Sequence, residues 1–129
     1  MAMTDAELIA LAEKAAGYSY SPYSHFRVGA ALECAGGRVF TGCNIENSAY
    51  GDTICAERTA AVKAVSEGER EFVRLAVWGS GDDYCTPCGS CRQFLSEFAA
   101  EEMTVLCAKE SGEAMKTTLG ALLPASFRL

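Results

Sequence analysis

The chain has few basic residues and no cluster of them. It carries 11 lysine and arginine residues against 17 aspartate and glutamate residues, which gives a formal net charge of −6 at pH 7. Surfaces that bind nucleic acid need clustered Lys and Arg to displace counterions from the phosphate backbone. The composition therefore argues against a nucleic-acid partner and favours a neutral or cationic small molecule.

Long apolar segments are absent as well. The first residues, Met1 to Glu7, have neither the basic start nor the apolar core of a secretory signal, and no segment approaches the apolar length that spans a bilayer. We therefore expect a cytoplasmic protein with no membrane partner. In that compartment its seven cysteines are reduced thiols, and clustered thiols usually serve metal binding or catalysis.

Internal repeats and low-complexity stretches are also missing. The chain has only 12 glycines and 3 prolines, and half of its 129 residues are hydrophobic, as expected for an ordinary globular chain. This length supports one sizeable hydrophobic core but not two. We predict a single domain over residues 1–129.

Hydrophobic periodicity and turn residues divide the chain into helices and strands. Thr4 and Glu7 have the spacing of a capping box, which predicts a first helix over residues 5–16. A Gly-Gly turn at 36–37 predicts a hairpin between two β-prone segments. The expected elements after the first helix are strands over 28–34 and 38–43, a helix over 54–66, a strand over 72–78, a helix that starts at Pro87 and turns Phe94, Leu95 and Phe98 inward, strands over 104–108 and 114–117, and a short helix over 119–123.

This order of elements has strands separated by helices. Such an order implies a sheet that is in part parallel and is covered by helical layers. The last two expected strands are joined by a short connection that contains Ser111-Gly112, so we expect them to pair antiparallel.

Three cysteines and one glutamate form the most informative pattern of the chain. Cys55, Cys88 and Cys91 are enough to hold a zinc ion while its fourth coordination position stays open. Glu57 lies two residues from one of these ligands and could handle protons at whatever binds there. An open zinc beside a carboxylate is typical of a hydrolytic site.

The predicted elements place these cysteines at helix starts. Cys88 and Cys91 are three residues apart on one helix, so they share a face. Helix N-termini carry partial positive charge, which lowers the pKa of a thiol and favours the thiolate that zinc needs. Three thiolates leave zinc with a net charge of −1, which weakens its ability to acidify water, and Arg58 and Arg92 are placed to offset that charge.

Two other interpretations of the cysteines remain open on the residues alone. A redox pair at Cys88 and Cys91 would need no third partner and lacks an aromatic residue before its first cysteine. A closed structural zinc site would recruit a fourth ligand, for which Cys85 is the main candidate. The weaker candidates are Cys34, Cys43, Cys107 and His25; free cysteines usually lie in the core, and His25 is expected to be an ordinary loop histidine.

Several separated blocks resemble the small, homotetrameric cytidine deaminases, and the similarity runs from about residue 18 to Phe127. The resemblance implies a three-layer α-β-α fold of the α/β class, with a mixed five-stranded sheet and helices on both faces. It also implies a homotetramer with active sites near the subunit interfaces. The blocks are Tyr20-Ser21-Pro22-Tyr23-Ser24-His25-Phe26, Val28-Gly29-Ala30-Ala31, Gly42-Cys43-Asn44-Ile45-Glu46-Asn47, Cys55-Ala56-Glu57-Arg58 and Pro87-Cys88-Gly89-Ser90-Cys91-Arg92-Gln93.

The resemblance implies one zinc per chain on Cys55, Cys88 and Cys91, with water or hydroxide as its fourth ligand. In the zinc deaminases of this class, the hydroxide attacks C4 of cytosine. Glu57 would take the proton of the water, deliver it to N3 and help to protonate the leaving ammonia. The implied activity converts cytidine and 2′-deoxycytidine to uridine and 2′-deoxyuridine in pyrimidine salvage.

The resemblance also implies the residues that contact substrate. Asn44 and Glu46 alternate along an extended segment, so their side chains can point to the same side, toward the ribose hydroxyls. Phe26 would pack against the pyrimidine, Ala56 would lie beside the substrate, and Phe127 would reach a neighbouring subunit's site or cover its own core.

The two arginines next to the cysteines are similar to residues that act on the metal ligands. Arg58 would donate hydrogen bonds to the zinc thiolates or pair with a nearby glutamate, and Arg92 could act like it. Two alternatives to cytidine deamination stay open: a deaminase of another aminopyrimidine nucleoside such as blasticidin S, and a structural zinc module without activity. A polynucleotide editor is disfavoured by the charge and by the lack of basic and aromatic tracks.

Overall fold

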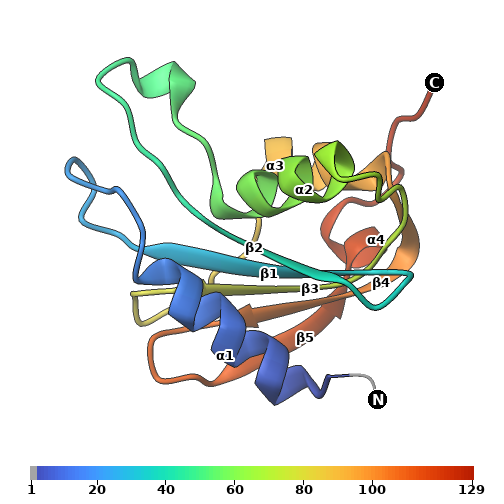
Figure 1. Cartoon of the computed structure of the whole chain (residues 1–129), viewed down its shortest axis with the longest axis horizontal. Helices are drawn as coiled ribbons and strands as arrows, with labels where there is room; N and C mark the ends of the chain where they lie inside the picture. Colours follow the sequence, from blue (N-terminus) through green and yellow to red (C-terminus); the bar gives the residue numbers. More distant parts are fainter. Residues whose placement is uncertain (1–2) are drawn as a thin grey trace.

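Five strands form one mixed sheet through the centre of the molecule (Figure 1). The computed structural model describes residues 3–129. Along the sheet the order is β2-β1-β3-β4-β5; β3 and β4 are parallel, and the other neighbours are antiparallel. The mixed α/β sheet and the antiparallel last pair are thus confirmed. The strands are β1 (Val28–Cys34), β2 (Val39–Cys43), β3 (Phe72–Gly79), β4 (Ala99–Ala108) and β5 (Ala114–Thr118).

Helices cover both faces of this sheet, as expected (Figure 1). On one face α1 (Asp5–Ala16) packs Leu8 and Ala12 against strand residues such as Ala31. The other face carries α2 (Ala56–Ser66), α3 (Gly89–Ser96) and α4 (Leu119–Leu122), which share a second core with Ala30 and Leu32. Adjacent residues of β1 enter different cores because strand side chains alternate between faces. Within residues 3–129, none of the helices combines the length and the apolar character needed to cross a membrane.

Two glycines let the helices lie directly against the strands. A Cβ on Gly29 would fall 1.8 Å from the carbonyl oxygen of Ala12 in α1. A Cβ on Gly42 would fall 2.6 Å from the carbonyl oxygen of Ala56 in α2. Gly42 pairs with Ala30, next to Gly29, so two helices clasp one pair of neighbouring strands from opposite faces.

The start of α1 has the predicted capping box. The hydroxyl of Thr4 accepts a hydrogen bond from the Glu7 amide at 3.1 Å, and the Glu7 carboxylate accepts one from the Thr4 amide at 2.9 Å. These bonds satisfy amide groups that a helix start otherwise leaves without partners, so the helix begins where the sequence predicts.

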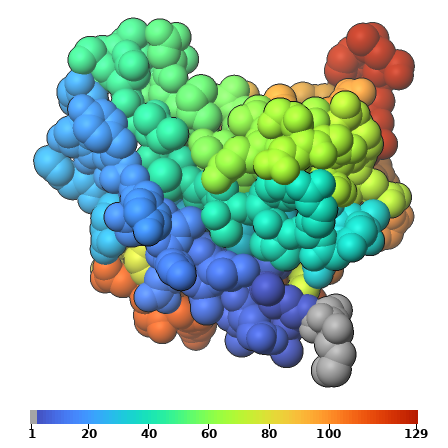
Figure 2. Space-filling model, viewed as in Figure 1, coloured from blue at the N-terminus to red at the C-terminus, as the bar shows by residue number. Residues whose placement is uncertain are grey.

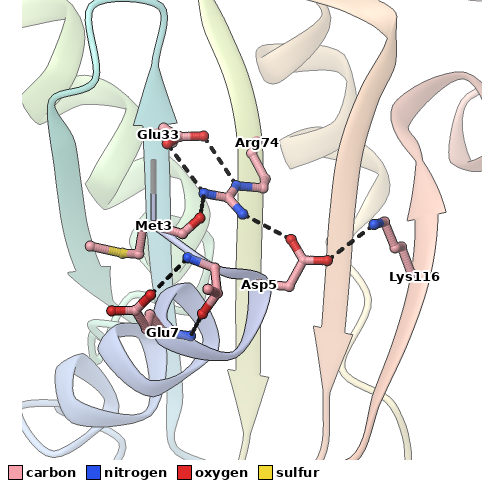
Figure 3. Close-up of polar contacts among 7 residues, drawn as sticks. Met3, Asp5, Glu7, Glu33, Arg74 and Lys116 are labelled. Carbon is pink, nitrogen blue, oxygen red and sulfur yellow. Dashed lines mark hydrogen bonds and ion pairs between the residues drawn. The ribbon is translucent and has the colours of Figure 1, made fainter. Parts of the chain in front are cut away.

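A half-buried charge cluster holds the start of α1 on the sheet (Figure 3). Arg74 of β3 pairs with Glu33 of β1 at 3.1 Å and with Asp5 of α1 at 2.8 Å. Its guanidinium also donates to the Met3 carbonyl, and Lys116 of β5 pairs with Asp5. One helix terminus is thereby linked to three strands.

Some predicted boundaries were wrong by a few residues. The second and third helices begin at Ala56 and Gly89, after Cys55 and Cys88, because both cysteines adopt extended N-cap geometry with ψ of 153° and 165°. Phe98 lies in a turn beyond the third helix, although it does pack inward, 5.3 Å from the ring of Phe72. The fourth strand starts at residue 99, not 104, and the ends of β2, β3, β5 and α4 differ by one residue.

Candidate metal centre and adjoining cavity

Three thiols from two helix starts meet at one point. Cys55 is the N-cap of α2, Cys88 is the N-cap of α3, and Cys91 lies in the first turn of α3. The Sγ atoms of Cys55 and Cys88 are 3.6 Å apart, and those of Cys88 and Cys91 are 3.4 Å apart. All three sulfur atoms lie within 4.8 Å of one another.

This spacing fits a zinc ion. Tetrahedral zinc with bonds of about 2.3 Å to sulfur separates its thiolates by about 3.8 Å. Neither N-cap cysteine uses its side chain to cap its own helix, so the sulfur atoms remain available for a metal. The donor set is therefore suitable for zinc in number, chemistry and distance.

The electrostatics of the cluster favour thiolates. The pKa of Cys55 is lowered to about 5, first because Cys91 donates a hydrogen bond to it and also because Cys88 and Arg58 lie close by. The pKa of Cys91 moves upward for the same reason, since it keeps the shared proton. The Nε of Arg58 is buried without a hydrogen-bond partner, and such a donor fits a set of metal-bound thiolates.

Glu57 follows Cys55 by two residues in α2, and its side chain lies inside the protein. Its exposed fraction is 4%, which excludes a solvated glutamate of a helix start. Burial, together with the nearby Cys55 thiolate, raises the pKa of its carboxyl to about 7. A carboxyl with such a pKa can both accept and release a proton near neutral pH.

A cavity of about 190 Å³ opens beside the thiols. Its walls include most of the residues that the sequence predicted to act together, although these come from distant segments. Those residues are Phe26, Asn44, Cys55, Ala56, Glu57 and Cys88.

The ring of Phe26 occupies a cradle that the sequence did not predict. A Cβ on Gly79 would lie 2.8 Å from Phe26 Cζ, and one on Gly81 would lie 3.1 Å from Phe26 Cε1. The two glycines at and after the end of β3 therefore make room for the ring at the cavity wall. A glycine pair directly after a buried strand was the signal that could have indicated them.

Asn44 is buried and is largely occupied by the protein itself. Its Oδ1 accepts hydrogen bonds from the Val28 amide at 3.0 Å and from the Ser19 hydroxyl, and its Nδ2 donates to the Phe26 carbonyl at 2.8 Å. One N–H of the side-chain amide remains for a ligand. Asn44 thus joins the loop before β1 to the segment after β2.

Glu46 lies outside the inner cavity, in an adjoining hollow of about 330 Å³. Its Oε1 accepts hydrogen bonds from the amides of Tyr23 at 2.9 Å and Ser24 at 3.1 Å, and the Ser24 hydroxyl donates to Oε2. These bonds, the Ser24 hydroxyl first, lower the pKa of Glu46. Thr53 lines both the hollow and the inner cavity, so the two spaces adjoin.

Arg92 and Phe127 lie away from the sulfur atoms. Arg92 donates to the carbonyls of Pro87 and Leu122, both at 2.7 Å, and so holds the start of α3 against α4. Phe127 is 66% exposed, and its carbonyl accepts a hydrogen bond from Gln93. The C-terminal tail that carries it projects from the body of the molecule (Figure 2).

Cys85, the candidate fourth ligand, is not part of the three-thiol group. It lines the cavity and packs against the core, and burial raises the pKa of its thiol to about 12. A thiol that stays protonated in this way is a poor ligand for zinc. The other cysteines, Cys34, Cys43 and Cys107, are free thiols outside the group.

Known proteins resemble this chain over most of its length. The family profile of the "Cytidine and deoxycytidylate deaminase zinc-binding region" matches residues 2–107. A cytidine deaminase from Sporosarcina psychrophila is 49% identical over 121 residues, which cover 94% of this chain and 89% of that protein. A cytidine deaminase from Mycobacterium tuberculosis is 40% identical over 92% of this chain and 85% of its own length.

Solved structures of similar proteins also resemble this chain. The crystal structure of a cytidine deaminase from Burkholderia pseudomallei has a TM-score of 0.93 and 42% identity, and the match covers 97% of this chain and 100% of that one. A cytidine deaminase from Mycobacterium tuberculosis has a TM-score of 0.80 and 40% identity over 95% of both chains.

Proposed function

The chain belongs to the cytidine and deoxycytidylate deaminase family, and on that premise we propose that it hydrolyses the amino group of cytidine and 2′-deoxycytidine. The products would be uridine or 2′-deoxyuridine and ammonia. The observation that carries the proposal is the meeting of three thiols and one buried carboxyl at a cavity.

In the reacting half of the site, the thiols would hold the metal and the Glu57 carboxyl would transfer protons. Zinc held by Cys55, Cys88 and Cys91 would supply a Lewis acid that lowers the pKa of a water in the cavity. Glu57 would accept the proton of that water, pass it to N3 of the cytosine ring and then assist the departure of ammonia. Its raised pKa, about 7, suits a group that must both take and give a proton.

The binding half would orient the nucleoside over these groups. Phe26 offers its ring to the pyrimidine from the cavity wall, and Ala56 lies between Cys55 and Glu57 on the same wall. The free N–H of Asn44 and the carboxylate of Glu46 would bind the ribose hydroxyls, Asn44 from the inner cavity and Glu46 from the adjoining hollow.

The remaining parts of the proposal concern the whole protein. We propose a single deaminase domain that acts in the cytoplasm, in pyrimidine salvage, as a homotetramer. Support for assembly comes from Phe127, which lies exposed on a projecting tail and would complete the site of a neighbouring subunit. Support for a reducing compartment comes from seven free cysteines within the part of the chain that the structure describes.

The rival functions have less support. A structural zinc module would need a fourth protein ligand, and Cys85 is neither in the thiol group nor readily ionised. A deaminase of another aminopyrimidine nucleoside, such as blasticidin S, would share the thiols and Glu57 but would not need hydroxyl-binding groups like Asn44 and Glu46.

The decisive experiment measures ammonia release from cytidine together with zinc content per chain. We expect Glu57→Ala to keep its zinc and to lose turnover by a factor of about 10²–10⁴ or more, because it lacks the proton carrier. Glu13→Ala removes an exposed glutamate of α1 and serves as the matched control, with turnover like the natural protein. Near-normal turnover of Glu57→Ala would contradict the catalytic role of Glu57. A zinc-loaded natural protein that releases no ammonia would contradict the proposed deaminase function.

A further inference from the structure

We propose that Ser24 is a positioning residue that holds Phe26 and Glu46 at a fixed separation, and that this separation makes the site prefer substrates with sugar hydroxyls. The inference rests on the proposed function, in which Phe26 meets the base and Glu46 meets the ribose. Ser24 itself does not line the inner cavity, and it has no contact with the reacting atoms in the proposed function.

The hydroxyl of Ser24 connects the two groups directly. Its oxygen accepts a hydrogen bond from the Phe26 amide at 3.0 Å, while its proton is donated to Oε2 of Glu46. A serine hydroxyl has one proton to donate, so this bond commits it to the carboxylate. The hydroxyl therefore cannot rotate away without losing a bond to one side or the other.

The Glu46 carboxylate is held from both of its oxygen atoms. Amides of Tyr23 and Ser24 donate to Oε1, while the Ser24 hydroxyl holds Oε2. A carboxylate that accepts several hydrogen bonds stays ionised and keeps a defined orientation. Its remaining lone pairs are then directed to ligand donors such as sugar hydroxyls.

The backbone between Ser24 and Phe26 is shaped for this contact. His25 has a φ of 58°, in the left-handed region that residues other than glycine adopt rarely. A left-handed residue turns the chain sharply, and here the Phe26 amide faces back to the hydroxyl two residues before it. Such a conformation persists only where neighbouring contacts stabilise it.

Ser24 completes a closed cycle of contacts around the binding half. Asn44 holds the Phe26 carbonyl, and Glu46 follows Asn44 by two residues on the same extended segment. Ser24 then links Glu46 back to the Phe26 amide. Without its hydroxyl, Oε2 of Glu46 and the Phe26 amide would lose the partner that links them, while the thiols and Glu57 would keep their places.

The experiment compares kcat and KM for cytidine and for 2′,3′-dideoxycytidine, which lacks the 2′ and 3′ hydroxyls of the sugar. In Ser24→Ala, we expect the preference for cytidine in kcat/KM to fall by about threefold to tenfold through a higher KM for cytidine. The kcat should stay close to that of the natural protein, and Ser24→Thr should restore most of the preference because it keeps a hydroxyl. Ser48→Ala is the matched control, since the Ser48 hydroxyl bonds to the Tyr23 hydroxyl and not to Glu46 or Phe26 within residues 3–129.

Zinc content and thermal unfolding are measured for every variant. Ser24 is exposed in a loop, so Ala at this position removes no core contact. An equal loss on both substrates would show a merely structural role and would overturn the inference, as would an unchanged preference in Ser24→Ala. A natural protein that releases no ammonia from cytidine is a different result, because it overturns the proposed function and the inference with it.

Discussion

Glu57 occupies a helix position where glutamate side chains are usually solvated. In the first turn of α2 its carboxyl would be expected to face water and to benefit from the helix dipole. Gly42 brings this turn directly against β2, and the carboxyl is buried with its pKa raised to about 7. The contact of α2 with β2 at Gly42 thus helps to place the Glu57 carboxyl inside the protein, at the wall of the cavity.

Cys85 and Cys88 should differ in what they do for the metal. We expect Cys85→Ser to keep one zinc per chain, because its thiol lies outside the three-sulfur group and remains protonated. Cys88→Ser should lose the zinc, because a serine hydroxyl does not replace a thiolate. Metal analysis of the purified chains tests both, and loss of zinc from Cys85→Ser would instead indicate a closed site with four thiolates.

Gly79 should control the position of the Phe26 ring. In Gly79→Ala the new methyl group would lie 2.8 Å from both Phe26 Cζ and Cys85 Cβ, so the ring must move into the cavity. We expect KM for cytidine to rise about tenfold, with zinc content unchanged. Gly36→Ala is the control, because a Cβ there meets nothing within 4 Å. A variant at position 79 with natural KM would show that the cradle yields without moving the ring.

At the scale of elements, a charge cluster around Arg74 attaches the start of α1 to the sheet. Arg74 is only 13% exposed and pairs with Glu33, which is equally buried, as well as with Asp5. Removing one partner from such a cluster leaves buried charge without compensation. The exposed pair of Arg38 with Glu67 has no such penalty, since solvent screens it.

We expect Arg74→Met to reduce the free energy of unfolding by about 3 kcal/mol. Glu67→Gln, which removes only the exposed partner of Arg38, is the control and should reduce it by about 0.5 kcal/mol. Urea unfolding followed by circular dichroism measures both. Equal effects of the two substitutions would mean that the cluster contributes no more than a surface pair.

The same cluster sets a pH dependence for Asp5. Hydrogen bonds from Arg74 and then from Lys116 hold the pKa of Asp5 below its ordinary value of 3.8. A lowered pKa contributes stability above the ordinary value, and this contribution is lost as the pH falls through the lowered one. We therefore expect Asp5→Asn to be less stable than the natural protein at pH 7 and to lose that disadvantage as the pH falls below 3.8 and through the lowered pKa. A gap of constant size across this range would contradict the assignment.

The elements could be predicted where local chemistry decides them. The capping box predicted the start of α1, and β-prone and apolar segments predicted the buried strands. The first residues of β4, Ala99 to Glu102, carry no β-prone pattern, and they pair only through Phe72, across an irregular register. Tertiary context, not local preference, makes that segment a strand.

At the scale of the whole molecule, exposed aromatic side chains gather on the loops and on the tail. Tyr18, Tyr20, Tyr50 and Phe127 are all more than half exposed. Large exposed apolar side chains of this kind often mark surfaces that bind another protein. A second copy of this chain is the partner that the proposed tetramer requires.

Phe127 offers a test of that assembly by mixing two defective chains. Phe127→Ala should lose about tenfold in kcat/KM if its ring is buried in a neighbouring site. Mixed oligomers of Phe127→Ala with Glu57→Ala should regain activity, because the Glu57→Ala chain lends its intact tail to the working carboxyl of its neighbour. If each tail served its own chain, mixing would give only the average of the two.

The chemical half of the candidate site could be predicted from the residues themselves. Thiol spacing and helix starts pointed to Cys55, Cys88 and Cys91, and the spacing from Cys55 pointed to Glu57, whereas the binding half was indicated by the resemblance. The cradle of Gly79 around Phe26 requires segments that are far apart in sequence to meet, which no local pattern encodes. The sequence predicted that Asn44 and Glu46 point to the same side; in the structure they line two adjoining spaces.

The close contacts at Gly29 and Gly42 limit how this protein could be engineered. Neither position can accept a side chain without moving backbone. The paired strands and the two helices against them should therefore move together as one rigid unit. A laboratory selection for larger bases could not enlarge the cavity from that side. Beneficial substitutions should instead gather in the loops that carry Phe26 and Cys85, which makes those loops the place to build a mutant library.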